Sequence, residues 1–187
     1  MMSSKTGAVL SDTNYAVIYD LHSHTTASDG RLTPEELVHR AGEMRVGTLA
    51  ITDHDTVDAI PRAQAEIARA GLALQLITGV EISTQWENHE IHIVGLNIDI
   101  ESPALTALLS AQIARRQQRG QMIAERLEKA HIPGAWEAAL KMADGGAVTR
   151  GHFARFLVEQ GKASNIADVF KKYLARGKTG YVPPQWW

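Results

Sequence analysis

Apolar, strand-like segments alternate with helical segments through residues 16–80, and this alternation constrains the fold more than any other feature. The strand-like segments are rich in β-branched residues and cover residues 16–21, 48–52 and 72–80. Amphipathic helical patterns separate them. Strands joined by helices favour a parallel sheet with the helices packed on its faces. The sequence therefore predicts an α/β fold.

The two helices between these strands carry clear signals at their ends. Thr33 is a good N-cap, and Glu36 stands three residues after it, which is the spacing of a capping box. We place Gly47 just past the end of this first helix. The second helix is predicted over residues 58–70, with Gly71 after its end.

The pattern changes in the second half of the chain. A fourth strand is predicted over residues 90–98, after a turn at residues 87–89. From there the pattern is mainly helical, with predicted helices over residues 103–130, 135–143 and 151–160, and a last one from Ser164 or Asn165 to Ala175.

Residues that bind metals follow the first three predicted strands. His22 and His24 come directly after the first strand, His54 follows the second, and Glu81 follows the third. In extended chain, positions i and i+2 lie on the same side, so the first two imidazoles can bind one ion. The carboxyl ends of parallel strands collect reactive groups at one edge of the sheet. This placement predicts a metal site, although each residue alone could be a chance surface residue or a helix cap.

Two more residues extend the predicted site. Asp29 lies in the loop after the first strand, where a carboxylate can return over the ion. His92 lies on the opposite strand face from Ile91 and Ile93, and we favour ligation over a buried structural histidine. Four histidines and two carboxylates exceed the needs of one tetrahedral zinc. They suit two or more ions, with Glu81 as a bridge, and the metals would be manganese, iron or zinc.

Composition excludes several classes of protein. The chain has no cysteine, so disulfides and cysteine-ligated zinc are excluded. The net charge is -2, so no overall basic field indicates a nucleic-acid binder. No apolar run reaches the roughly 20 residues that span a bilayer. We expect residues 1–14 to be a mobile tail and not a secretory signal, and the protein to be cytoplasmic with no obligate protein partner.

These motifs together resemble the PHP (polymerase and histidinol phosphatase) family. The likeness is carried by Asp-Leu-His-Ser-His-Thr at residues 20–25, Ser-Asp-Gly at 28–30, Ile-Thr-Asp-His-Asp at 51–55, Gly-Val-Glu-Ile-Ser at 79–83 and His-Ile-Val-Gly at 92–95. The resemblance implies a distorted seven-stranded (β/α) barrel with a site for up to three metal ions, often manganese. The implied ligands present here are His22, His24, Asp29, His54, Glu81 and His92.

The resemblance also implies a division of the chain. Residues 15–102 would form the first part of the barrel, 103–175 an inserted helical region, and 176–187 a loop leading back to the barrel. The family pattern continues with Ala-His-Pro and Ser-Asp-Phe-His segments that supply three further ligands. Neither segment occurs in this sequence, so we expect an N-terminal fragment with a partial barrel, whose own activity is open.

Residues 149–155 and 177–183 are similar to one branch of the family, the bacterial RNase AM proteins. The similarity implies 5′-to-3′ exoribonuclease and 3′,5′-nucleotide bisphosphate phosphatase activity, with RNA, short oligonucleotides and nucleotide bisphosphates as substrates. The hypothesis is that metal-activated hydroxide attacks phosphorus. Arg150 and Lys178 are candidates for phosphate binding, and His152 could hold the phosphate or the leaving oxygen.

The same residues also allow simpler interpretations. Arg150 and Lys178 could be solvated loop charges, and His152 could cap a helix. The basic residues at 115–129 could follow an RNA backbone or simply form a solvated helix face. The whole protein could instead be a phosphatase for a small metabolite such as histidinol phosphate, or a non-catalytic metal-binding module.

Overall fold

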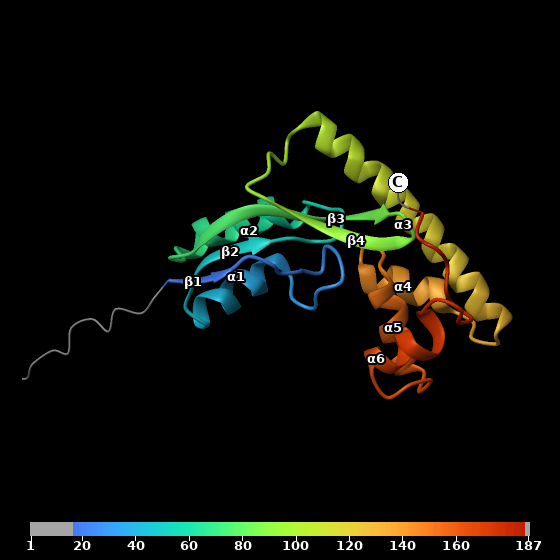
Figure 1. The fold of residues 1–187 in the computed structure, drawn as a ribbon. Coiled ribbons are helices and arrows are strands. Elements are labelled where there is room, and N and C mark those ends of the chain that lie inside the picture. The colour runs from blue at the N-terminus through green and yellow to red at the C-terminus, as the bar shows by residue number, and fades with distance from the viewer. Residues whose placement is uncertain (1–16, 186–187) are drawn as a thin grey trace, which may run out of the picture.

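The computed structural model describes residues 17–185 and contains one four-stranded sheet (Figure 1). Its strands lie in chain order: β1 (Ile18–Asp20), β2 (Val46–Ile51), β3 (Gln75–Trp86) and β4 (His89–Leu96). The first three strands are parallel and β4 is antiparallel to β3. The predicted α/β fold and the parallel order of the first three strands are confirmed. The expected tail at residues 1–14 lies outside the described residues.

Helices α1 (Pro34–Glu43) and α2 (Ala59–Ala70) connect the parallel strands. The predicted capping box is present, with Thr33 Oγ1 accepting from the Glu36 amide at 3.2 Å and Glu36 Oε2 accepting from the Thr33 amide at 2.9 Å. The prediction that Gly47 stands just past the end of α1 is wrong. The helix ends at Glu43 with Met44 as its C-cap, and Gly47 already lies in β2, where a Cβ atom would come within 2.9 Å of the Val17 side chain.

Strand β3 is longer than the sequence predicts. We expected it to end at Val80, but it continues to Trp86 and forms a hairpin with β4. The antiparallel partner explains the difference, because β4 supplies backbone hydrogen bonds beyond the point where the parallel pairing with β2 stops. Glu81 therefore lies in the middle of a strand and not at its end.

The rest of the described chain is mostly helical. Helix α3 (Pro103–Lys129) runs without interruption, and α4 (Ala135–Ala143), α5 (Arg150–Glu159) and α6 (Ile166–Val169) follow. Thr149 caps α5 and Asn165 caps α6, as predicted. The predicted last helix is instead a short α-helix followed by a π-helical turn at Phe170–Leu174. None of the described helices is long and apolar enough to cross a bilayer.

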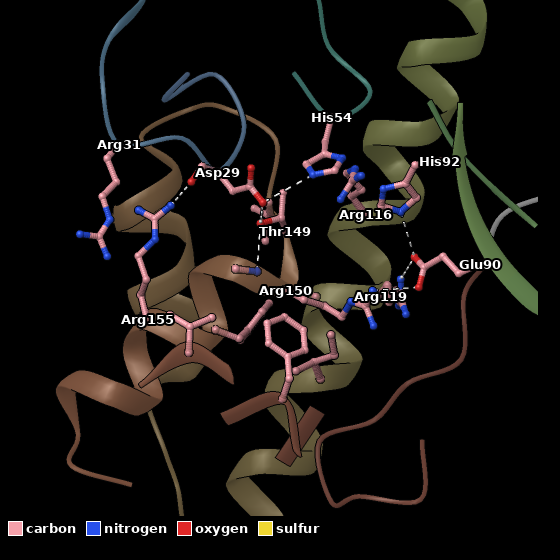
Figure 2. Close-up of a pocket in the computed structure, with 17 residues that line it drawn as sticks. Asp29, Arg31, His54, Glu90, His92, Arg116, Arg119, Thr149, Arg150 and Arg155 are labelled. Atoms are coloured by element: carbon pink, nitrogen blue, oxygen red, sulfur yellow. Dashed lines mark hydrogen bonds and ion pairs between the residues drawn. The ribbon is translucent and has the colours of Figure 1, made fainter. Parts of the chain in front are cut away.

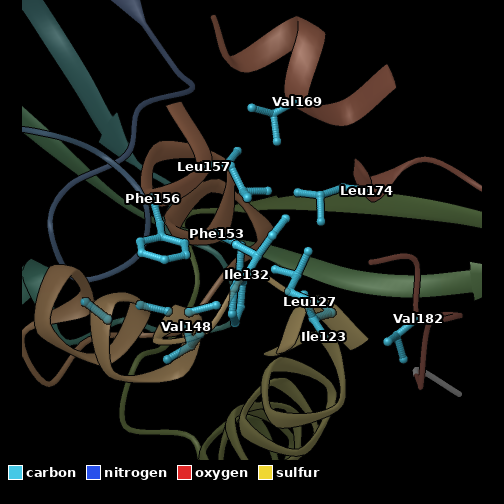
Figure 3. Close-up of a cluster of buried hydrophobic side chains, with 14 residues drawn as sticks. Ile123, Leu127, Ile132, Val148, Phe153, Phe156, Leu157, Val169, Leu174 and Val182 are labelled. Atoms are coloured by element: carbon cyan, nitrogen blue, oxygen red, sulfur yellow. The ribbon is translucent and has the colours of Figure 1, made fainter. Parts of the chain in front are cut away.

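Two clusters of buried apolar side chains stabilise these elements. One lies between α1, α2 and the sheet and includes Val38, Leu49 and Ile60. The other lies among α3, α4, α5 and the following turns, and Figure 3 shows Leu127, Phe153 and Leu157 close together in it. Helix α3 connects the two regions, because its apolar side chains join the second cluster while its Arg116 hydrogen-bonds to Asp55 and Ser83, beside the sheet.

Candidate metal centre

Glu81 lies at the centre of a cluster of imidazole rings. Its Oε2 atom is 3.0 Å from Nε2 of His22, 3.0 Å from Nε2 of His24 and 3.7 Å from Nδ1 of His54. Its other oxygen, Oε1, is 2.9 Å from Nδ1 of His92. The two carboxylate oxygens thus contact different histidines, which is the arrangement that a bridging ligand between two ions requires.

Asp29 extends this cluster on its other side. Its carboxylate oxygens are 3.6 Å from Nδ1 of His24 and 3.6 Å from Nε2 of His54. The six predicted residues therefore form three overlapping groups, and within each group the candidate ligand atoms lie within 4.8 Å of one another. These groups are His22–His24–Glu81, His24–Asp29–His54 and His54–Glu81–His92.

The donor atoms fit divalent ions. Bonds of about 2.0–2.1 Å at tetrahedral angles place two ligand atoms about 3.3 Å apart. The Nε2 atoms of His22 and His24 are 3.1 Å apart, and each is 3.0 Å from Glu81. Nδ1 of His54 is buried and has no hydrogen-bond partner among the described residues. A buried polar atom rarely stays unpaired, so the site is suited to a bound ion there.

The protonation states also favour ligation. Burial lowers the pKa of His54 to about 3, so its imidazole is neutral near pH 7. Burial by itself would raise the pKa of the Glu81 carboxyl. The surrounding histidines, and His54 most strongly, lower this pKa, and the result lies below the ordinary value. A neutral imidazole and an ionised carboxylate are the forms that bind metal.

Two buried aspartates hold the loops that carry these ligands. Asp53 accepts from the amide and the hydroxyl of Thr25, both at 2.7 Å, and from the hydroxyl of Ser28 at 2.6 Å. These bonds fix the loop after β1. Asp53 was not among the predicted site residues, although it stands beside His54.

The second buried aspartate, Asp55, joins the loop after β2 to helix α3. It accepts from the Ser83 amide at 2.9 Å and from Arg116 Nε at 2.7 Å. Asp55 and Asp58 both precede α2, but Asp58 makes no side-chain cap bond and Asp55 binds Arg116. The sequence separation of 61 residues explains why no local pattern indicates this pair.

Gly30 gives a direct test of how tightly the ligand loop is packed. A Cβ atom there would lie 2.3 Å from the carbonyl oxygen of His24. We expect Gly30→Ala to lower the free energy of unfolding by about 1–3 kcal/mol and to weaken metal binding, because the backbone next to two ligands must shift. Urea denaturation and metal titration measure both effects.

Gly42 in α1 is the matched control for this substitution. A Cβ atom there would meet nothing within 4 Å. Gly42→Ala is expected to raise stability by about 0.4–1 kcal/mol, because it restricts the unfolded chain. Equal effects of the two alanines would show that the loop is not sterically constrained.

A cavity of about 400 Å³ opens beside the cluster (Figure 2). Asp29, His54 and His92 line it, so it reaches the candidate metal site. Its walls also hold five arginines: Arg31, Arg116, Arg119, Arg150 and Arg155. This concentration of guanidinium groups makes the cavity suitable for an anionic ligand such as a phosphate ester.

Glu90 orients two of these arginines. Its carboxylate accepts from Arg119 at 3.0 Å and from Arg150 at 2.9 Å. It also lies 3.9 Å from Nε2 of His92 and is the main reason that the pKa of His92 is raised. Glu90 therefore connects the candidate metal site with the arginine wall, and it was not among the predicted site residues.

The three predicted phosphate-binding residues are placed differently. Arg150 lines the cavity. His152 is buried, its Nδ1 accepts from the Thr149 amide at 3.0 Å, and burial lowers its pKa to about 4, so it is a neutral helix cap. Lys178 is exposed and does not line the cavity. Phosphate contact stays a prediction for all three.

The basic residues of α3 were expected either to follow RNA or to form a solvated face. Arg116 and Arg119 are not part of an outer surface, because both side chains are buried. Arg116 hydrogen-bonds to Asp55, and Arg119 hydrogen-bonds to Glu90. Arg126 donates to the carbonyl oxygen of Tyr181. These arginines therefore hold the helical region against the sheet and the segment after the π-helical turn.

Comparisons with known proteins support this picture. The chain is 81% identical over 180 residues to the 5′-3′ exoribonuclease Rnm of Salmonella typhimurium, and the match covers 96% of this chain and 61% of that protein. It is 42% identical over 168 residues to a 3′,5′-nucleoside bisphosphate phosphatase of Chromobacterium violaceum, covering 89% of this chain and 58% of the relative. The chain thus spans about 60% of the length of the curated relatives that it matches.

A solved structure has the same fold. An amidohydrolase from Chromobacterium violaceum, solved with bound sulfate and no metal, superposes with a TM-score of 0.85 at 42% identity. The match covers 90% of this chain and 59% of that one, so the sheet described here corresponds to a curled half-barrel. The profile of the PHP domain matches residues 20–182. The chain belongs to the PHP domain family.

Proposed function

We propose that this chain carries the metal and phosphate sites of a metal-dependent phosphoesterase that acts as a 5′-3′ exoribonuclease and a 3′,5′-nucleotide bisphosphate phosphatase. One observation supports this most strongly: a cluster of four imidazoles and two carboxylates opens into a cavity lined by five arginines. The names of two relatives provide the substrates, which are RNA for one and nucleoside bisphosphates for the other. In this proposal the protein acts in the cytoplasm.

In this proposal the cluster holds divalent ions, manganese first and iron or zinc as alternatives, with up to three in the whole protein. Such ions supply a hydroxide nucleophile near neutral pH and neutralise charge on phosphoryl oxygens. His22 and His24 would hold one ion with Glu81, and His54 and His92 would share the same carboxylate. Asp29 would complete the set between His24 and His54.

The arginine wall would orient the substrate. The guanidinium of Arg150 is fixed by Glu90 and lies 5.7 Å from the centre of the Phe170 ring. It can still donate to a phosphate through its remaining N–H groups, and a fixed guanidinium loses little entropy on binding. The cavity volume of about 400 Å³ lies in the range of small-ligand sites, which is enough for one terminal nucleotide.

The proposal is tested by replacing both His22 and His24 with alanine in the full-length protein. Elemental analysis should show a loss of most bound metal, and hydrolysis of a nucleoside 3′,5′-bisphosphate should fall by at least about 1000-fold, since the ions supply several kcal/mol of transition-state stabilisation. His89→Ala, at an exposed position outside the cluster, is the control.

Two results would contradict the proposal. Retention of metal and activity in the double variant would show that the cluster is not the centre. Faster turnover of histidinol phosphate than of the bisphosphate by the parent protein would favour a phosphatase for small metabolites instead.

A further inference from the structure

We propose that a second hollow, next to the cavity, binds the phosphodiester backbone of the RNA nucleotides downstream of the cut. This inference rests on the proposed function and adds to it a path for the rest of the substrate. The hollow has a volume of about 690 Å³ and lies between the loop at residues 26–31 and helices α4, α5 and α6. It shares Arg31, Arg155 and Ile166 with the first cavity, so the two hollows adjoin each other at these residues.

The arginines at the junction of the two hollows, Arg31 and Arg155, differ in their pairing from the arginines deeper in the first cavity. Arg116 is paired with Asp55, and Arg119 and Arg150 are paired with Glu90. Neither Arg31 nor Arg155 forms an ion pair with any residue in the described part of the chain. The two arginines without a protein carboxylate therefore lie where the two hollows meet.

Arg31 and Arg155 are presented in different ways. Arg31 is exposed and makes no hydrogen bond within residues 17–185. Arg155 donates from Nη2 to the backbone carbonyl oxygen of Asp29, which orients the guanidinium without neutralising it. An oriented guanidinium and a solvent-exposed guanidinium at one junction suit successive phosphates of a flexible strand.

Asp29 connects this junction to the cut site. Its carboxylate is 3.6 Å from His24 and His54, while its backbone carbonyl accepts from Arg155. Figure 2 shows Arg31 and Arg155 on one side of Asp29 and His54 and His92 on the other. A strand with its terminal nucleotide in the first cavity can therefore pass Asp29 and reach both arginines.

The lining of the second hollow favours a backbone contact over base recognition. Its floor includes Met142, Val158 and Ile166, and none of its lining residues is aromatic. Sugars can pack on such a floor, but bases lack a ring to stack on. Glu159 is the one carboxylate among the lining residues. Contacts to phosphates position a strand without reading its sequence, so binding here would be independent of sequence.

The experiment compares two substrates in the full-length, metal-loaded protein. For Arg31→Gln, we expect kcat/KM for a 5′-phosphorylated hexaribonucleotide to fall about tenfold more than kcat/KM for a nucleoside 3′,5′-bisphosphate, because only the longer substrate reaches the second hollow. Arg155→Lys keeps the positive charge but loses the bidentate geometry of the guanidinium. The difference between its losses of kcat/KM on the two substrates should therefore be smaller than for Arg31→Gln. Arg40→Gln, in α1 and outside both hollows, controls for net charge.

Binding without catalysis separates this inference from the proposed function. With EDTA present, a fluorescent 2′-O-methyl hexanucleotide should bind with a salt dependence that is weaker by about 0.7 in log–log slope for Arg31→Gln than for the parent. An unchanged slope, or equal losses on both substrates, would overturn the downstream site. If the parent protein hydrolyses neither substrate, the proposed function fails, while the slope still decides whether the hollow binds RNA.

Discussion

Glu81→Gln is expected to weaken binding of divalent metal by more than about 100-fold and to abolish hydrolysis that depends on it. Loss of a partner outside the ligand set already costs about 10–100-fold in metal affinity. Glu81 lies within 3.0 Å of two histidines through one oxygen and 2.9 Å from a third through the other. The amide keeps the shape of the side chain, but it carries no charge and only one oxygen, so it cannot bridge two ions.

Metal titration of the purified variant checks this expectation, and far-UV circular dichroism checks that β3 and β4 still form. Glu43→Gln is the matched control, because Glu43 is exposed at the end of α1 and its carboxylate forms an ion pair with Arg40. We expect no change in metal affinity for the control. If Glu81→Gln bound metal as tightly as the parent, the bridging role of Glu81 would be excluded.

The candidate ligands could be predicted because each lies in a short motif next to a predicted strand. Their meeting in space follows from the parallel order of β1, β2 and β3, which brings the ends of separate segments to one edge. The position of Glu81 after the end of the third predicted strand was only part of the explanation for its place in the cluster. It lies inside β3, and it reaches the site because an isolated parallel bridge pairs it with His54 and because β4 carries His92 beside it.

The arginine wall could not be predicted in the same way. Arg116 lies 61 residues from Asp55 in the sequence, and Arg119 and Arg150 lie 29 and 60 residues from Glu90. All three arginines belong to helices whose position depends on the packing of the whole chain. Charge patterning along α3 indicates a solvated or RNA-binding face equally well. Only the tertiary structure shows that Arg116 and Arg119 point inward, toward carboxylates.

The end of α1 shows a second limit of local signals. Glycine is the residue that usually adopts a left-handed conformation after a helix, so Gly47 was the natural choice. In the structure Arg45 has a φ of 58° and ends the turn, and Val46 pairs with Ile18 directly afterwards. The pairing of β1 with β2 thus fixes where the helix must stop, at the cost of a strained arginine.

Arg116→Ala is expected to lower the free energy of unfolding by about 3–5 kcal/mol, the largest stability effect that we predict. Asp55 is fully buried and Arg116 is 7% exposed, and their charged atoms are 2.7 Å apart. Without the Arg116 guanidinium, the Asp55 carboxylate stays buried and its negative charge is no longer neutralised. Small domains have total stabilities of about 5–15 kcal/mol, so urea denaturation should reveal the loss clearly.

The exposed pair of Arg62 and Glu35 is the matched control, with a similar distance of 2.8 Å but side chains 55% and 35% exposed. Because water screens this pair, Arg62→Ala should cost less than about 1 kcal/mol. A double variant, Asp55→Ala with Arg116→Ala, should be less destabilised than the sum of the two single variants, since neither charge is left unpaired. Additive losses would show that the two groups do not stabilise each other. If the folded fraction of Arg116→Ala also binds metal more weakly, α3 positions His54 by holding Asp55, which is next to His54 in the sequence.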